Sequence, residues 1–137
     1  MSTTFSINEY LLLSRGQWDA SKSPEEVQGA IDAFYAWHAR LVAEGRFKSG
    51  QRLAKGAKLV TRSGITDGPF TEAKELIGGY WFVLARSLEE AARIAADNPC
   101  LACGLAFEVR PIEPEQASAY RDGNETPADA GWFSGAR

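Results

Sequence analysis

Two helix-start signals divide this chain and constrain its fold class. Residues 23–26 (Ser-Pro-Glu-Glu) and 87–90 (Ser-Leu-Glu-Glu) each place a capping serine three positions before a glutamate, which is a capping box. The first signal predicts a helix that ends near Gly45, because glycine readily takes a left-handed C-cap. The second predicts a shorter helix that Asn98 and Pro99 stop.

The segments around these helices have the apolar patterns of strands. Strands are predicted at residues 9–14, 80–85 and 105–110, with shorter strand pieces between residues 47 and 61. Residues 62–64 (Arg-Ser-Gly) predict a hairpin turn. The order is strand, helix, strand or hairpin, strand, helix, strand, which is the split βαβ or ferredoxin-like pattern. The predicted class is α+β, an antiparallel sheet with two helices on one face.

That arrangement leaves one sheet face uncovered, and the strand at residues 80–85 is the most aromatic in the chain. A monomer that exposed Trp81 or Phe82 and their neighbours on that face would show a large apolar patch. Pairing two such faces would remove the patch, so we predict a twofold homodimer. Any small-molecule cleft is then expected at the junction between the two sheets.

Composition argues against several classes of protein. A chain of 137 residues has the usual size of one domain. The formal net charge of −3 argues against a nucleic-acid partner, which would require a basic stripe. No apolar run approaches the ~20 residues that cross a bilayer, so we expect no membrane partner. Two cysteines without an export signal predict a reducing cytoplasm.

Residues 65–79 combine turn, charge and glycine signals. Asp67-Gly68-Pro69 is turn chemistry, since Asp can bond its own backbone, Gly takes positive φ and Pro fixes φ. Residues 72–75 (Glu-Ala-Lys-Glu) follow, where a plain turn would need no charge cluster. Gly78-Gly79 lets another backbone or a ligand approach closely. The stretch indicates a site but specifies no reaction.

This stretch resembles the DGPF signature of the YCII-related domain family. The match comprises Asp67-Gly68-Pro69-Phe70, the charged residues 72–75 and Gly78-Gly79-Tyr80. Residues 108–111 (Glu-Val-Arg-Pro) resemble the family's last strand, and residues 87–95 resemble its second helix. The resemblance covers residues 7–113, so the expected domain is 1–113. Residues 114–137 form an extension whose aromatic residues suggest that part of it docks.

The resemblance implies a ferredoxin-like fold that assembles as a dimeric α+β barrel. It implies no established reaction, and many members look like companions of alternative sigma factors. The implied site of the wider family lies in a cleft between sheets and includes a histidine and an aspartate. Asp67 matches the signature aspartate. The family's first-helix histidine falls nearer Phe34 than His38 in rough register.

Asp67 is the first candidate for chemistry, as a general base or a ligand-orienting carboxylate. The alternative is a turn former that bonds its own backbone. A base would need a pKa raised by burial or by a neighbouring carboxylate, and Glu72 and Glu75 are the nearby candidates. Lys74 would act on that pKa in the opposite direction.

Glu108 and Arg110 project from one face of the last strand, opposite its apolar face. They are candidates for lining the cleft, with the guanidinium binding an anionic group of a substrate. The alternative, which we favour slightly, is an ion pair at the dimer interface. Tyr80 and its aromatic neighbours would form a wall for a small apolar ligand or, as we favour, the core of the interface.

His38 is the only histidine, and its unperturbed pKa suits proton transfer. It shares a helical stripe with Val27, Ile31, Phe34 and Leu41, so a histidine at the core or its edge is favoured. Cys100 and Cys103 form a CxxC pair, but they follow a helix C-terminus, where the dipole disfavours a thiolate. We therefore favour a structural role for both cysteines.

The leading hypothesis is a cytoplasmic homodimer that binds a small molecule in an inter-sheet cleft. No zinc-type ligand spacing or phosphate loop is found, so no metal or cofactor is expected. Whether the protein is an enzyme stays open; catalysis would be acid–base chemistry by Asp67, with Arg110 orienting the substrate. The alternatives are a non-enzymatic regulatory module tied to transcription initiation and a purely structural dimer.

Overall fold

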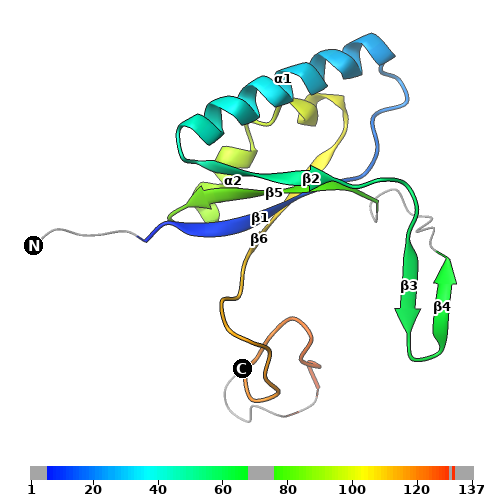
Figure 1. Cartoon of the computed structure of the whole chain (residues 1–137), viewed down its shortest axis with the longest axis vertical. Helices are drawn as coiled ribbons and strands as arrows, with labels where there is room; N and C mark the ends of the chain where they lie inside the picture. The colour runs from blue at the N-terminus through cyan, green and yellow to red at the C-terminus, as the bar shows by residue number, and fades with distance from the viewer. Residues whose placement is uncertain (1–5, 68–75, 130, 132–137) are drawn as a thin grey trace, which may run out of the picture.

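The fold is a four-stranded antiparallel sheet with two helices on one face (Figure 1). The computed structural model describes residues 6–67, 76–129 and 131. In chain order the elements are β1 (Asn8–Arg15), α1 (Pro24–Ala43), β2 (Phe47–Arg52), β3 (Lys58–Thr61), β4 (Gly64–Asp67), β5 (Ile77–Ala85), α2 (Leu88–Ala95), the 3-10 helix η2 (Pro99–Cys103) and β6 (Ala106–Pro111).

The sheet runs in the order β2-β5-β1-β6, with every neighbouring pair antiparallel. The first and last described strands, β1 and β6, therefore pair with each other, and β5 lies between β1 and β2. The predicted α+β class is confirmed, and the βαβ arrangement is consistent with a ferredoxin-like fold. The sheet strand β2 lies in the segment where the sequence indicated only short strand pieces.

Helix α1 begins at the predicted capping box. The Ser23 hydroxyl accepts from the Glu26 backbone N–H at 3.1 Å, and the Glu26 carboxylate accepts from the Ser23 N–H at 3.0 Å. The predicted C-cap is also present, because Gly45 has a φ of +74° just beyond the helix end. The buried residues of α1 are Phe34, Trp37 and Leu41, whereas Val27, Ile31 and His38 of the predicted stripe are half-buried.

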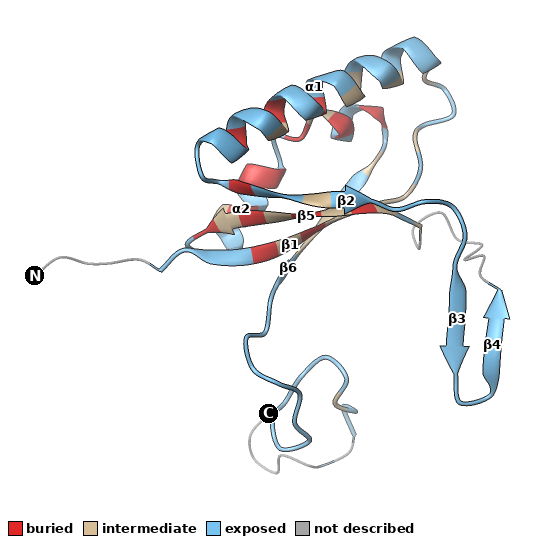
Figure 2. Cartoon of the chain, viewed as in Figure 1, coloured by how far each residue is buried: buried red, intermediate tan, exposed pale blue. Residues whose placement is uncertain are grey.

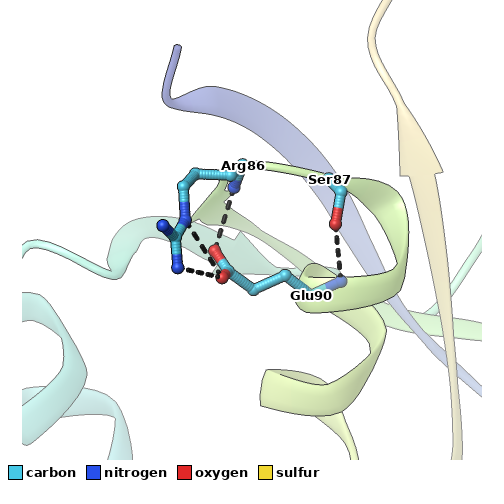
Figure 3. A network of polar contacts seen from close by, with 3 residues as sticks. All are labelled: Arg86, Ser87 and Glu90. Atoms are coloured by element: carbon cyan, nitrogen blue, oxygen red, sulfur yellow. Dashed lines mark hydrogen bonds and ion pairs between the residues drawn. The ribbon is translucent and has the colours of Figure 1, made fainter. Parts of the chain in front are cut away.

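Helix α2 starts with only half of the predicted capping box (Figure 3). The Ser87 hydroxyl accepts from the Glu90 N–H at 3.0 Å, as expected. The Glu90 carboxylate instead accepts from the backbone N–H of Arg86 at 2.9 Å and from its guanidinium at 3.1 and 3.3 Å. These hydrogen bonds lower the pKa of Glu90 and fix the turn from β5 into α2.

Burial alternates along the two central strands, as Figure 2 shows in red and tan. On β1, Tyr10, Leu12 and Ser14 are buried towards the helices, while Leu11 and Leu13 between them are half-buried. Strand β5 does the same, because its residues 79, 81, 83 and 85 are buried and residues 80, 82 and 84 are half-buried.

Trp81 therefore lies on the helix side and not on the uncovered face. Its ring meets Phe34 of α1 edge-on, with centroids 5.1 Å apart. Trp37 packs in the same edge-to-face manner on Phe47 of β2 at 5.2 Å. Of the two aromatic residues that the sequence offered for the uncovered face, only Phe82 projects there, because neighbouring strand residues point to opposite sides.

Strands β3 and β4 form a separate two-stranded hairpin at the predicted turn. In Figure 1 this hairpin extends away from the sheet on the side opposite α1. The chain after β6 also leaves the sheet. Its described hydrogen bonds, such as that from the Arg121 guanidinium to the Gln116 carbonyl, lie within the tail itself. Tyr120 of this tail is 90% exposed.

Gly50 is required by the close pairing of β2 with β5. A Cβ on this residue would lie 1.8 Å from the Tyr80 carbonyl oxygen and 2.9 Å from the Trp81 Cα. Both neighbours are backbone atoms in the middle of the sheet, so they cannot move aside without breaking the ladder. The register shift between Lys48 and Gln51 occurs at this point.

We predict that Gly50→Ala lowers the free energy of unfolding by more than about 2 kcal/mol. Gly29→Ala is the control, because a Cβ there meets nothing within 4 Å in the middle of α1. That change should raise stability by about 0.5–1 kcal/mol through helix propensity. Urea unfolding of the two variants measures both effects. A Gly50→Ala variant as stable as the parent protein would contradict the close approach.

Candidate functional site

A pocket of about 530 Å³ lies between the middle of α1 and one end of the sheet. Five aromatic side chains contribute to its wall: Trp18, Phe34, Tyr35, Trp81 and Phe107. The volume falls within the ~300–1,000 Å³ of small-molecule sites, which are mostly apolar with a few polar groups. The polar and charged groups among its described lining residues are Ser14, Gln17, Arg52, Lys55 and Cys100.

The loop after β1 contributes Gly16, Gln17 and Trp18 to the pocket lining. The Gly16 N–H donates to the Leu76 carbonyl at 3.0 Å, which ties the start of this loop to the strand region before β5. The Asp19 N–H donates to the Cys103 carbonyl at 2.8 Å, which ties the other end of the loop to η2. Trp18 lies between these two anchors and packs half-buried against the core.

The charge in the pocket lining is basic. Arg52 ends β2, and its Nε donates to the Gly78 carbonyl at 3.1 Å, which leaves the two terminal guanidinium nitrogens for other partners. Lys55 follows in the loop to β3 and is exposed. No carboxylate occurs among the described residues that line this pocket. The site therefore combines an aromatic wall with two cationic side chains.

Cys100 borders the pocket as a neutral thiol. Burial, followed by the neighbouring Cys103, raises the pKa of Cys100 to about 11. Its Sγ lies 3.7 Å from the Ala30 carbonyl oxygen, and the Cys103 Sγ lies 3.8 Å from the Glu26 carbonyl oxygen. Both thiols are free and buried against α1. The geometry agrees with the structural role that the sequence favoured for the CxxC pair.

Asp67 lies at the end of the β3–β4 hairpin, outside the pocket lining. Its carboxylate pairs with Lys58 across the hairpin, and its side chain is 77% exposed. Glu72 and Lys74, the other predicted site residues of this stretch, lie outside the residues that the structure describes. Among the described residues, Asp67 makes no contact with Glu108 or Arg110.

Glu108 and Arg110 lie together on the uncovered face of the sheet. The Arg110 guanidinium donates to Glu108 Oε2 at 2.7 Å, and Arg15 of β1 reaches Glu108 Oε1 at 3.2 Å. Tyr80 lies on the same face, and its hydroxyl donates to Gln51 Oε1 at 3.4 Å. The structure thus keeps these three predicted site residues away from the pocket.

His38 packs at the edge of the core between α1 and β2. Its ring lies 5.4 Å from that of Phe47 and 6.0 Å from that of Phe34, measured between centroids. The Nε2 atom is 3.4 Å from the Ser49 hydroxyl oxygen. Burial lowers the pKa of this histidine. It does not line the pocket, so the geometry agrees with an edge-of-core histidine.

A protein-family model, the YCII-related domain, matches residues 9–116, which is most of the chain. The chain belongs to the YCII-related domain family. A search of curated proteins gave no match. Apart from Asn8 at the start of β1, the matched region of this YCII-related protein includes the strands and α-helices that the structure describes, together with the pocket.

Among residues 6–67, 76–129 and 131, no three His, Cys, Asp or Glu side chains gather into a group that could hold a metal ion. None of the helices in the described part of this YCII-related protein is long and apolar enough to cross a membrane.

Arg52 and Lys55 were missed by the sequence analysis of this YCII-related protein. They lie between Gly50 and Gly56 in a segment without a clear period, and no motif marks them. Trp18 gave a weak signal, because a tryptophan in an otherwise polar loop needs a partner surface. Only the fold shows that the loop after β1 and the end of β2 meet at one pocket.

Acidification should destabilise the folded protein through His38. Its pKa is lowered from 6.5 in the folded state, so the unfolded chain binds a proton that the folded protein resists. The free energy of unfolding should fall as the pH drops from neutrality through 6.5. His38→Gln should flatten this slope in urea unfolding series at stepped pH.

The carboxylates Glu26 and Glu90 provide an internal reference for this experiment. Their pKa values are lowered from 4.5, so the stability that they contribute is lost only at more acidic pH. Both should behave alike in the parent protein and in His38→Gln. An unchanged slope near pH 6.5 in the variant would contradict the burial of this histidine.

Proposed function

We propose that this YCII-related protein binds a small aromatic anion in the pocket between α1 and the sheet. The observation that carries the proposal is the lining, in which five aromatic rings stand beside Arg52 and Lys55 without a described carboxylate. A flat apolar body would stack on the rings, and an anionic group would pair with the guanidinium. The expected cleft between two sheets stays a prediction, since it needs a second copy.

The basic pair favours an anion over a neutral ligand of the same shape. Arg52 is held in place by its hydrogen bond to Gly78, so the free edge of the guanidinium has a fixed direction. Lys55 has no hydrogen bond or ion pair with any described residue. An incoming carboxylate could therefore pair with Lys55 without breaking a described ion pair.

Acid–base catalysis by Asp67 is the finer hypothesis that the geometry supports least. A general base must come within hydrogen-bond reach of a bound substrate. Asp67 pairs with Lys58 in the hairpin, and Arg110 pairs with Glu108 on the other side of the sheet from the pocket. We therefore propose ligand binding as the function. Catalysis by Asp67 would require that a substrate bound in the assembled protein comes within hydrogen-bond reach of this carboxylate.

We also propose that the protein is a homodimer through the uncovered sheet face. The centre of that face is apolar and half-buried, formed by Leu11, Leu13, Tyr80, Phe82 and Leu84. Ion pairs flank it, one between Lys48 and Glu9 and one joining Arg15, Glu108 and Arg110. An apolar centre with a charged rim is the usual anatomy of an interface.

Two finer assignments accompany this proposal. We propose that the protein belongs to the DGPF-signature subgroup of the family, and the sequence Asp67-Gly68-Pro69-Phe70 supports this assignment. A reducing cytoplasm is the compartment we propose, supported by the two free, buried thiols of Cys100 and Cys103.

Ligand binding is tested with matched pairs of small aromatic compounds. Benzoate and naphthoate should raise the melting temperature and change tryptophan fluorescence, because Trp18 and Trp81 line the pocket. Benzamide, the neutral counterpart of benzoate, should bind about 5- to 10-fold more weakly, since it lacks the charge-assisted hydrogen bonds. Lys55→Gln and Arg52→Lys should reduce the preference for the anion.

Arg121→Gln is the control for net charge, because Arg121 lies in the tail and pairs there with Glu115. It should leave the affinity for benzoate unchanged. Equal binding of benzoate and benzamide, or equal loss in Arg121→Gln and Lys55→Gln, would show that the basic pair does not select the ligand. Failure of every aromatic anion to bind would sink the proposed function.

The dimer is tested by placing a charge at the centre of the uncovered face. Phe82→Lys should raise the dimer dissociation constant at least ~100-fold, because each copy would bury an unpaired ammonium. Light scattering at micromolar concentration measures the change. Tyr120→Lys is the matched control, since it introduces the same charge at an aromatic residue of the exposed tail.

A parent protein that scatters as a monomer would contradict the homodimer. The uncovered face would then be available to a different protein, which favours the regulatory alternative tied to transcription initiation. A dimer that survives Phe82→Lys would show that another surface joins the two copies.

A further inference from the structure

The β3–β4 hairpin has no support from the rest of the described chain. Its two four-residue strands pair only with each other, in a sheet separate from the main one. Figure 1 shows that it extends beyond the sheet on the side opposite α1. An isolated two-stranded hairpin is at best marginally stable in water. The hairpin therefore needs another surface to pack on.

One face of the hairpin carries an apolar pair that faces solvent. Val60 and Ile65 are direct cross-strand partners, and each is 69% exposed. The ion pair between Lys58 and Asp67 lies on the same face, two residues away along each strand. Leu59 points to the opposite face and is 47% exposed. Val60 and Ile65 thus form a short apolar stripe without a partner in the described chain.

The position of the hairpin indicates what covers this stripe. The uncovered sheet face and the hairpin lie on the same side of the molecule, away from α1 (Figure 1). A second copy that packs on the face would therefore come within reach of the hairpin. The face itself carries charges of both signs, with Glu9 and Glu108 beside Lys48, Arg15 and Arg110. Such a rim can complement a copy of itself under twofold symmetry.

The area of the uncovered face supports the same partner. Four strands spaced ~4.8 Å apart, each of about six residues at ~3.3 Å, give a patch of roughly 400 Å² in projection. A stable interface buries ~800 Å² of accessible surface on each partner. The accessible surface of the face is larger than its projected area, because side chains protrude from it. Even so, the area that the face alone could bury remains at the low end for a stable interface. If the β3–β4 hairpin of each copy also contacted the other copy, the buried area would increase by two further contacts.

We infer that the β3–β4 hairpin is an arm that clasps the second copy of this chain, with Val60 and Ile65 packed on the partner. This inference rests on the proposed homodimer and adds a second contact region to it. The twofold axis makes the contact reciprocal, so each dimer contains the apolar pair twice. The ion pair of Lys58 with Asp67 then borders a buried stripe and helps to hold the two strands in register.

The arm is tested with Val60→Thr/Ile65→Thr, which keeps both residues β-branched and suited to a strand. Loss of the four apolar contacts should raise the dimer dissociation constant roughly 10- to 100-fold in sedimentation or light-scattering titrations. Leu59→Thr is the matched control on the opposite face of the hairpin and should leave the constant within about threefold. An equal effect of both changes would overturn the assignment of the Val60–Ile65 face.

Hydrogen exchange of the parent protein gives a second measurement that does not depend on the variants folding. The amides of residues 58–67 should be protected above the dissociation constant and exchange rapidly below it. Protection that does not vary with concentration would mean that the chain's own tail covers the hairpin, and absent protection would mean that nothing does. Either result overturns the arm.

The experiment separates the arm from the dimer on which it rests. A parent protein that is monomeric at all concentrations contradicts both. A dimer that Phe82→Lys dissociates and Val60→Thr/Ile65→Thr leaves intact retains the sheet-face interface and eliminates the arm.

Discussion

The pairing of β1 with β5 is the constraint on which the rest of the structure depends. Leu12 lies opposite Trp81 in the centre of the sheet, and both point towards the helices. A shift of this pairing by one residue would turn every side chain of one strand to the other face. The register therefore fixes at once which aromatic residues form the core, which line the pocket and which remain on the uncovered face.

Strand β5 serves three surfaces because its residues alternate. Trp81 contacts Phe34 in the core and also forms part of the pocket wall. Tyr80 and Phe82 project to the uncovered face, where their rings meet edge-on with centroids 6.0 Å apart. Gly79 allows this strand to lie close to β2, since a Cβ there would be 3.0 Å from the Gln51 carbonyl oxygen. Strand packing thus explains Gly79, whereas a Cβ at Gly78 would meet only the Ser14 side chain, at 3.4 Å or more.

The elements were predictable where a local rule determined them. The capping serines fixed both helix starts, and the alternation of Leu105, Phe107 and Val109 assigned the core face of the last strand. The side of Trp81 was not predictable, because apolar residues occupy both faces of β5 and periodicity cannot rank them. The contact of Glu90 was also not predictable from the capping-box rule, because its carboxylate accepts a hydrogen bond from the Arg86 N–H instead of the Ser87 N–H.

The site was harder to predict than the fold because its residues share no local signal. Asp67, the first candidate from the sequence, lies on the hairpin, whereas the pocket forms where the loop after β1, the middle of α1 and the end of β2 converge. Convergence of this kind depends on the strand order, in which β2 and β1 flank β5. Arg52 reaches the pocket only because β2 ends beside Gly78 at the start of β5. The position of this positive charge in the pocket lining is therefore a property of the topology.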